Sequence, residues 1–243
     1  MSGVNPNIIA NTDEETIGIL MEMIQQCASN PCYELEARLG HLNDNGTFIP
    51  GVARSHMDQL IRGMDILVAR ETNEMKTECD EWIEEENYYF TNNQRKMRSR
   101  VSFDAQQLRI NTTTIEKTII KSIILKSHVM DVRICLSKEN VVASVPSIIN
   151  TTHVRLKQRR TFTSNTSPFI VDCSIIWVGK TKTLAEKEQM SKEPLFEIEC
   201  EFNNATIKEW MKKYEKNRNK MAKSFMYKIA DVMLASGINF IKV

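Results

Sequence analysis

Charged residues of one sign recur at every second position in two segments of the chain. Glu197, Glu199 and Glu201 form an acidic row, and Arg155, Lys157 and Arg159 form a basic one. A period of two places each row on one face of a β-strand. Solvated sheet faces usually mix signs, because like charges two apart repel each other. The two rows are therefore predicted to face each other across an enclosed space that holds a cation and a polyanion.

A pair of carboxylates with the same spacing occurs near the start of the chain. Glu34 and Glu36 lie two apart on a predicted strand, and a distant strand can supply a third carboxylate. Oxygen-only ligation of this kind suits a hard divalent ion such as Mg²⁺ or Mn²⁺. The basic row would then neutralise phosphate charge, with Arg forks making bidentate contacts and Lys acting as a point charge. The predicted substrate is a chain of phosphates.

Three other kinds of site are not supported by their motifs. Gly179-Lys180-Thr181 resembles the end of a P-loop, but Ser174 stands where the earlier glycine is required. Cys32 and Arg38 have the spacing of a cysteine phosphatase, yet no glycine lies between them to shape an amide cradle. The four histidines are isolated in the sequence, so we expect no zinc site.

The elements that would position these residues can be read from the periodicity. Apolar residues at helical spacing predict helices over about 12–28, from Ser55 onward, and over about 204–236. From about Cys79 to Phe202 the period changes from 3.6 to 2, and the early segment around Glu34 behaves in the same way. The count is about eight strands, which is enough to close a barrel. We expect an α+β protein.

Length and composition narrow the class of protein. The 243 residues suit one large domain, and 32 basic against 31 acidic residues give a net charge of +1, which excludes a bulk basic polyanion binder. No run of eighteen apolar residues and no secretory signal is present, so we expect an intracellular protein without a membrane partner. The six cysteines contain no CxxC pair and are expected to be reduced thiols.

Three segments resemble the signature strands of the triphosphate tunnel metalloenzymes. They are YELEARLG (33–40), RLKQRRTF (155–162) and FEIECEF (196–202). The nearest branch is that of the metal-dependent RNA 5′-triphosphatases of fungal, protozoan and viral mRNA capping. The resemblance covers about residues 30–205. It implies an eight-stranded antiparallel β-barrel enclosing a hydrophilic tunnel, with helices packed on the outside, in a single domain spanning 1–243.

The resemblance also implies roles for particular residues. Glu34, Glu36 and Glu201 correspond to the metal ligands, and Glu197 and Glu199 would orient the attacking water. Asp172 would fix a neighbouring basic side chain. Lys117 is preferred to Lys121 on the middle strand, although the pattern there does not fix the register. The residues that would hold the triphosphate are Arg100, Lys117, Arg133, Arg155, Lys157 and Arg159.

The implied activity is hydrolysis of the γ-phosphate of triphosphate-ended RNA with Mg²⁺ or Mn²⁺, the first step of mRNA 5′ capping. RNA would be recognised without regard to its sequence. An mRNA guanylyltransferase is a candidate partner in another chain, and the location would be nuclear, or cytoplasmic for a viral protein. Alternatives are an inorganic, thiamine or nucleoside triphosphatase of the same fold, an ATP-cyclising enzyme, or a non-catalytic polyphosphate- or RNA-binding module.

Overall fold

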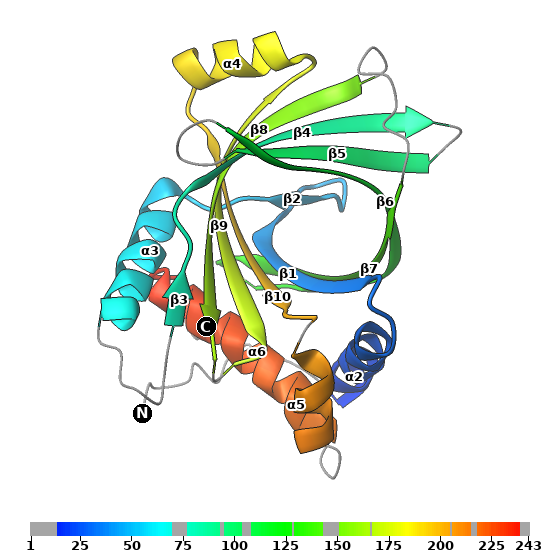
Figure 1. Ribbon diagram of the computed structural model, residues 1–243. Coiled ribbons are helices and arrows are strands. Elements are labelled where there is room, and N and C mark those ends of the chain that lie inside the picture. The colour runs from blue at the N-terminus through cyan, green and yellow to red at the C-terminus, as the bar shows by residue number, and fades with distance from the viewer. Residues whose placement is uncertain are drawn as a thin grey trace.

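Eight antiparallel strands close into a barrel in the computed structural model (Figure 1). The order around the barrel is β10-β9-β8-β4-β5-β6-β7-β1, and pairing of β1 with β10 completes it. The structure describes residues 14–69, 77–92, 95–103, 108–127, 129–142, 151–165, 167–204, 206–214 and 218–238. The barrel strands are β1 (Tyr33–Leu42), β4 (Ile83–Asn92), β5 (Arg95–Phe103), β6 (Arg109–Leu125), β7 (Asp131–Val141), β8 (Thr151–Ser164), β9 (Phe169–Gly179) and β10 (Leu195–Phe202).

Two short strands extend this sheet beyond the barrel. β2 (Phe48–Pro50) pairs with the end of β1, and β3 (Thr77–Cys79) pairs with β8. Gly40 is the cross-strand partner of Pro50 in β2, and a Cβ atom at Gly40 would come within 2.2 Å of the Ile49 carbonyl oxygen. The absence of a side chain is therefore what allows the two strands to approach.

Side chains alternate between the barrel interior and a core outside it. On β10, Phe196, Ile198, Cys200 and Phe202 belong to the outer core, while the glutamates between them point inward. Helices α2 (Glu14–Ser29), α5 (Ile207–Lys213) and α6 (Arg218–Ala235) lie together beneath the wall that contains β1 and β10 (Figure 1). Burial of each large apolar side chain in this core contributes roughly 1.5–3 kcal/mol, and this packing leaves the inner face free for polar residues.

The remaining helices lie elsewhere on the barrel. α3 (Arg54–Ala69) buries Met57, Leu60 and Met64 and joins the same core. α4 (Lys182–Ser191) packs on β8 and β9, on the side away from α6. Within the described part of the chain, no helix has the length and apolar character needed to cross a bilayer.

The eight-stranded antiparallel barrel with outer helices is confirmed. One predicted element is wrong, since the long helix over 204–236 is divided into α5 and α6, with Tyr214 ending the first. The helix α4 was not predicted. The predicted start of the first helix at Thr12 lies outside the described residues, and the helix is seen from Glu14 to Ser29.

Candidate active site

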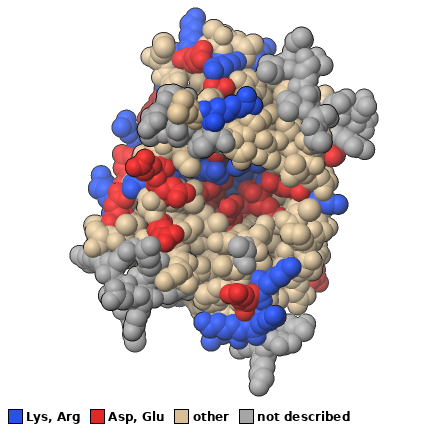
Figure 2. Space-filling view, in the orientation of Figure 1, with Lys and Arg blue, Asp and Glu red and all other residues tan. Residues whose placement is uncertain are grey.

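The barrel interior is a narrow, charged tunnel. Figure 2 shows the central hollow, with Lys and Arg along one side and Asp and Glu along the other. Ten of the twelve predicted site residues line it, and the exceptions are Glu197 and Arg133. The lining residues are Glu34, Glu36, Arg38, Asn87, Tyr89, Arg98, Arg100, Lys117, Arg155, Lys157, Arg159, Asp172, Glu199 and Glu201.

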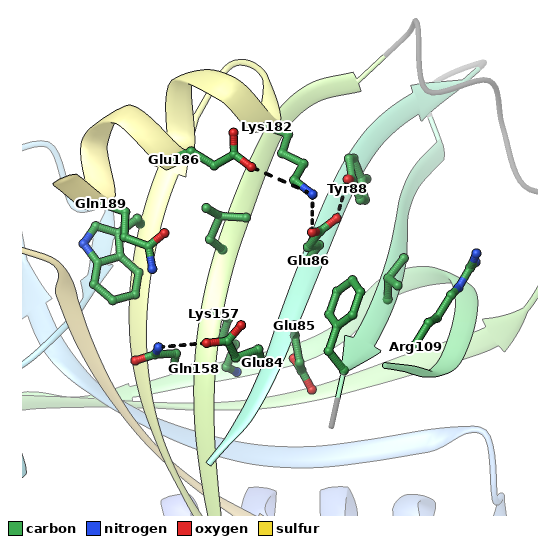
Figure 3. A pocket seen from close by; sticks show the side chains of 14 residues that line it. Glu84, Glu85, Glu86, Tyr88, Arg109, Lys157, Gln158, Lys182, Glu186 and Gln189 are labelled. Carbon is green, nitrogen blue, oxygen red and sulfur yellow. Dashed lines mark hydrogen bonds and ion pairs between the residues drawn. The ribbon is translucent and has the colours of Figure 1, made fainter. Parts of the chain in front are cut away.

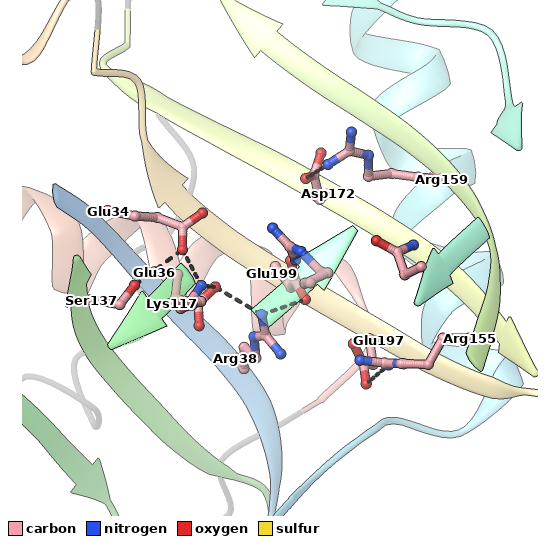
Figure 4. Close-up of polar contacts among 12 residues, drawn as sticks. Glu34, Glu36, Arg38, Lys117, Ser137, Arg155, Arg159, Asp172, Glu197 and Glu199 are labelled. Atoms are coloured by element: carbon pink, nitrogen blue, oxygen red, sulfur yellow. Dashed lines mark hydrogen bonds and ion pairs between the residues drawn. The ribbon is translucent and has the colours of Figure 1, made fainter. Parts of the chain in front are cut away.

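The carboxylates of β1 and β10 are brought together by strand pairing. Glu36 is the direct cross-strand partner of Glu201, and Arg38 that of Glu199. The Arg38 guanidinium Nη2 lies 2.8 Å from Glu36 Oε2 and 3.2 Å from Glu199 Oε1. Arg38 is therefore shared by a carboxylate of each strand, which fixes both side chains (Figure 4).

Lys117 reaches the acidic side of the tunnel from β6. Its ammonium group donates a hydrogen bond to Glu34 and lies 3.5 Å from Glu36 Oε2 and 3.2 Å from Glu139 Oε1. Lys121 instead contacts Glu22 of helix α2 on the outside of the barrel, at 3.1 Å. A register shift in the β6–β7 pairing between Ile119 and Lys121 separates the two lysines.

The cations of β8 contact carboxylates from several strands. Arg155 Nη2 lies 2.5 Å from Glu197 Oε1, although β9 separates β8 from β10. Arg159 lies 2.6 Å from Glu85 Oε1 of β4 and 3.4 Å from Asp172 Oδ2 of β9. The Asp172 carboxylate also accepts a 2.6 Å hydrogen bond from Thr161. Asp172 thus lies where it can orient Arg159, as the resemblance implied.

The electrostatic field divides the glutamates into two kinds. Burial raises the pKa of Glu201 well above its usual range, and the carboxylates of Asp172 and Glu34 raise it further. Burial also opposes ionisation of Glu199, but Arg38 and the tunnel lysines outweigh it and lower the pKa of Glu199 well below its usual range. Glu199 is therefore a stable anion, whereas burial and the neighbouring carboxylates oppose ionisation of Glu201.

The donor set on β1 and β10 fits a hard divalent cation. Glu34, Glu36 and Glu201 supply only carboxylate oxygens, and Glu201 makes no ion pair with any described residue. Among the described side chains, no three His, Cys, Asp or Glu groups are gathered closely enough to hold an ion. The reason is that Glu34 and Glu36 are turned toward Lys117 and Arg38, so binding an ion requires these carboxylates to exchange partners.

Several tunnel residues were not assigned a role from the sequence. Arg38 and Arg98 are visible in period-two patterns, Glu34-x-Glu36-x-Arg38 and Arg98-x-Arg100, and this signal could have found them. Glu85 and Asn87 are harder to find, because the run Glu84-Glu85-Glu86 hides the alternation. The charge on Glu85 is buried between Arg100 at 3.6 Å and Arg159 at 2.6 Å, so it helps to position both cations.

The two predicted residues outside the tunnel lining are still close to it. Glu197 is buried against Arg155, and Arg133 lines a second cavity that opens from the tunnel between β5, β6 and β7. A further cavity of about 540 Å³ lies on the outer wall beneath α4 (Figure 3). Three cations line it, Arg109, Lys157 and Lys182, and Lys182 is already paired with Glu86 and Glu186.

The closed antiparallel barrel with an inward-facing set of carboxylates and cations defines the protein as a tunnel-fold phosphohydrolase. The model of the family described as mRNA capping enzyme, beta chain, matches residues 41–234, and the chain belongs to this family. The family supports the activity predicted from the sequence, hydrolysis of the 5′-triphosphate end of RNA, and dependence on a metal ion is general in it. Among curated proteins, none matches the chain in sequence.

Solved structures of RNA triphosphatases share the fold. The chain is similar to the S. pombe Pct1 RNA triphosphatase, with a TM-score of 0.67 and 14% identity over 90% of this chain and 93% of that one. The same S. pombe enzyme has been solved in complex with the Spt5 CTD, with 15% identity, a TM-score of 0.67, and 91% and 94% of the two chains covered. The mimivirus capping enzyme triphosphatase has a TM-score of 0.59 and 11% identity over 93% and 98% of the chains.

Proposed function

We propose that this chain removes the γ-phosphate of triphosphate-ended RNA with Mg²⁺ or Mn²⁺ held by Glu34, Glu36 and Glu201. The observation that carries the proposal is the division of charge inside one enclosed tunnel. Carboxylates gather where β1 meets β10, and cations from β5, β6 and β8 face them. The bound ion would supply neutralisation of the negative charge that develops during in-line displacement.

Substrate binding would exchange the partners of the tunnel residues. Lys117 and Arg159 are now neutralised by carboxylates, at Glu34 and at Glu85 and Asp172. If Glu34 and Glu36 held an ion, Lys117 would keep only Glu139 as a carboxylate partner and could contact phosphate oxygens. The same residues therefore stay neutralised with and without substrate, because a polyanion and a cation enter together.

Glu199 is the best-placed residue to orient the attacking water. It lines the tunnel, and its lowered pKa keeps it ionised and able to accept a hydrogen bond from water. Glu197 is held by Arg155 at 2.5 Å, so we assign it the positioning of that guanidinium. The buried arginines then supply charge-assisted hydrogen bonds to the phosphates, which are shorter and stronger than neutral ones.

The direct test is release of labelled γ-phosphate from triphosphate-ended RNA with Mg²⁺, with Mn²⁺ and with excess EDTA. We expect metal-dependent release and a diphosphate end on the RNA. Tripolyphosphate, thiamine triphosphate and ATP form the comparison panel. If the protein hydrolyses one of these compounds but not the RNA, the alternative activity is established. Phosphate release in excess EDTA would show that the reaction does not need a metal ion.

The diphosphate end is the substrate for guanylyl transfer, so we propose that a guanylyltransferase receives the product. The family, which is that of an mRNA capping enzyme chain, supports this proposal. A coupled assay with labelled GTP and a capping guanylyltransferase should convert the product to capped RNA. Failure of the product to accept guanylate would contradict the assignment of a diphosphate end.

A further inference from the structure

A second cavity of about 510 Å³ opens from the tunnel between β5, β6 and β7. Seven residues line this cavity and not the tunnel, and four of them, Lys96, Met97, Ile119 and Arg133, are called the mouth here. The other three are Glu116, Thr118 and Cys135. The two spaces are continuous, because six side chains line both. These shared residues are Glu36, Arg38, Tyr89, Arg98, Lys117 and Arg155.

The mouth cavity adjoins only part of the tunnel. Glu34, Glu201, Asp172 and Arg159 line the tunnel but not the mouth cavity. Of the three proposed metal ligands, Glu36 lines both spaces, and Glu34 and Glu201 line the tunnel alone. A triphosphate with its γ-phosphate at these carboxylates would have its α-phosphate, and whatever is attached to it, directed toward the mouth.

The mouth contains two cations, Lys96 and Arg133, that form no ion pair with a described carboxylate. Lys96 is exposed on its rim. Arg133 stacks over the Phe48 ring at 4.9 Å from its centroid, and its buried Nε has no hydrogen-bond partner among the described residues. Both cations can meet a phosphodiester without first losing a carboxylate.

The mouth also has apolar surface that a bare polyphosphate would not need. Ile119 is 61% exposed, and Met97, which is buried, also lines the cavity wall. Tyr89 lines the cavity, and its ring stacks on His153 with centroids 4.3 Å apart. Cations beside apolar and aromatic surface match a nucleotide, whose base and ribose adjoin its phosphate.

We propose that the mouth binds the first nucleotides of the RNA, with Lys96 and Arg133 at the first phosphodiester and the base against Ile119 and the Tyr89 wall. This inference rests on the proposed function. Lys96 and Ile119 would then be specificity residues: they favour RNA over free triphosphates, and they do not contact the reacting phosphate. Phosphodiester contacts are independent of sequence, so the preference extends to any RNA.

The test compares Lys96→Glu with wild type on tripolyphosphate, GTP and triphosphate-ended RNAs of two, five and twenty nucleotides. The variant replaces a positive charge at the phosphodiester by a negative one. It should therefore lower kcat/KM for the RNAs about five- to twentyfold at low salt, mainly by raising KM. Values for tripolyphosphate should stay within about twofold, because a distant exposed charge is largely screened. Lys208→Glu makes the same charge change on α5, where Lys208 is exposed, and should leave RNA hydrolysis unchanged.

Two further variants separate the base contact from the charge. Ile119→Ser should raise KM for RNA and for GTP but not for tripolyphosphate, and Lys96→Gln should give a smaller RNA effect than Lys96→Glu. Three results would each overturn the inference. Lys96→Glu could hydrolyse RNA with the same kcat/KM as wild type, Lys208→Glu could lose as much kcat/KM for RNA as Lys96→Glu, or Lys96→Glu could lose as much kcat/KM for tripolyphosphate as for RNA. Failure of the wild type to act on RNA while it cleaves tripolyphosphate would instead overturn the proposed function.

Discussion

Arg38 is a central residue of the tunnel, and it carries its charge with little access to water. Burial opposes its ionisation, but Glu199 and Glu36 outweigh burial and raise the pKa of Arg38 well above its usual range. Its Nε is buried without a partner among the described residues, while the terminal nitrogen Nη2 contacts both carboxylates. The bridge between the two strands is therefore made by one nitrogen atom of the guanidinium group.

Glu201 and Glu199 should respond in opposite ways to loss of charge. Glu201→Gln removes a carboxyl group whose ionisation is opposed by burial and by the neighbouring carboxylates, so the metal-free protein should gain about 1–2 kcal/mol of unfolding free energy. Glu199→Gln removes the anion that neutralises Arg38, and should cost on the order of 2–3 kcal/mol. Both variants should lose most phosphatase activity. Thermal unfolding in EDTA measures both effects. Melting temperatures that shift in the same direction in the two variants would contradict the prediction.

Arg159→Lys tests whether the planar guanidinium matters as well as its charge. Arg159 spans Glu85 and Asp172, and a lysine cannot keep both contacts in the same geometry. The expected loss in transition-state stabilisation is about 1–3 kcal/mol, seen as a fall in kcat/KM. Arg160→Lys is the matched control, since Arg160 follows on the outer face and pairs with Asp65 at 2.8 Å. Similar kinetics for the two variants would place Arg159 outside the mechanism.

At the scale of elements, sequence alone predicts the strands well, because alternation is strong where one face is charged and the other is packed. The choice between Lys117 and Lys121 could not be made from the sequence, because the register shift in β6 is produced by pairing with β7. Helix α4 was missed because only Ala185 of its residues is buried, so it has almost no apolar stripe. Thr181, considered as part of a P-loop, instead caps this helix by accepting a hydrogen bond from the Leu184 amide.

Gly40→Ala tests the close pairing of β1 and β2. The new methyl group would lie within 2.2 Å of the Ile49 carbonyl oxygen and 2.8 Å of Phe48 Cζ, so the strands must separate. Overpacking of this kind typically costs about 1–3 kcal/mol, and the melting temperature should fall. Gly18→Ala on α2, where nothing lies within 4 Å, should instead be stabilising by up to about 1 kcal/mol. An unchanged melting temperature for Gly40→Ala would mean that the strands are not closely packed there.

At the scale of the molecule, a net charge of +1 conceals a strong internal separation of charge. The apolar faces of the strands pack against the outer helices, and the barrel therefore directs its charged faces inward. The tunnel's anions neutralise its cations, which allows so many charges to be buried together. The nuclear or, for a viral protein, cytoplasmic location expected from the resemblance stays a prediction.

This mutual neutralisation predicts that metal and triphosphate bind cooperatively. An ion alone would take Glu34 and Glu36 from Lys117 and Arg38, and would leave Lys117 with Glu139 and Arg38 with Glu199 as their remaining carboxylate partners. A triphosphate alone takes the cations and leaves the carboxylates uncompensated. Bound together they satisfy both sets, so we expect a coupling free energy of about 1–3 kcal/mol, in the range common for linked sites.

Thermal unfolding with Mn²⁺, with a non-hydrolysable β,γ-methylene triphosphate, and with both measures this coupling. The combined stabilisation should exceed the sum of the separate ones, because a ligand that binds only the folded state stabilises it in proportion to its affinity. Lys117→Met should reduce the coupling, since Glu34 then no longer has to leave a cation to bind the ion. Strictly additive shifts in the wild type would show that the carboxylates and cations act independently, and that partner exchange in the tunnel does not accompany binding.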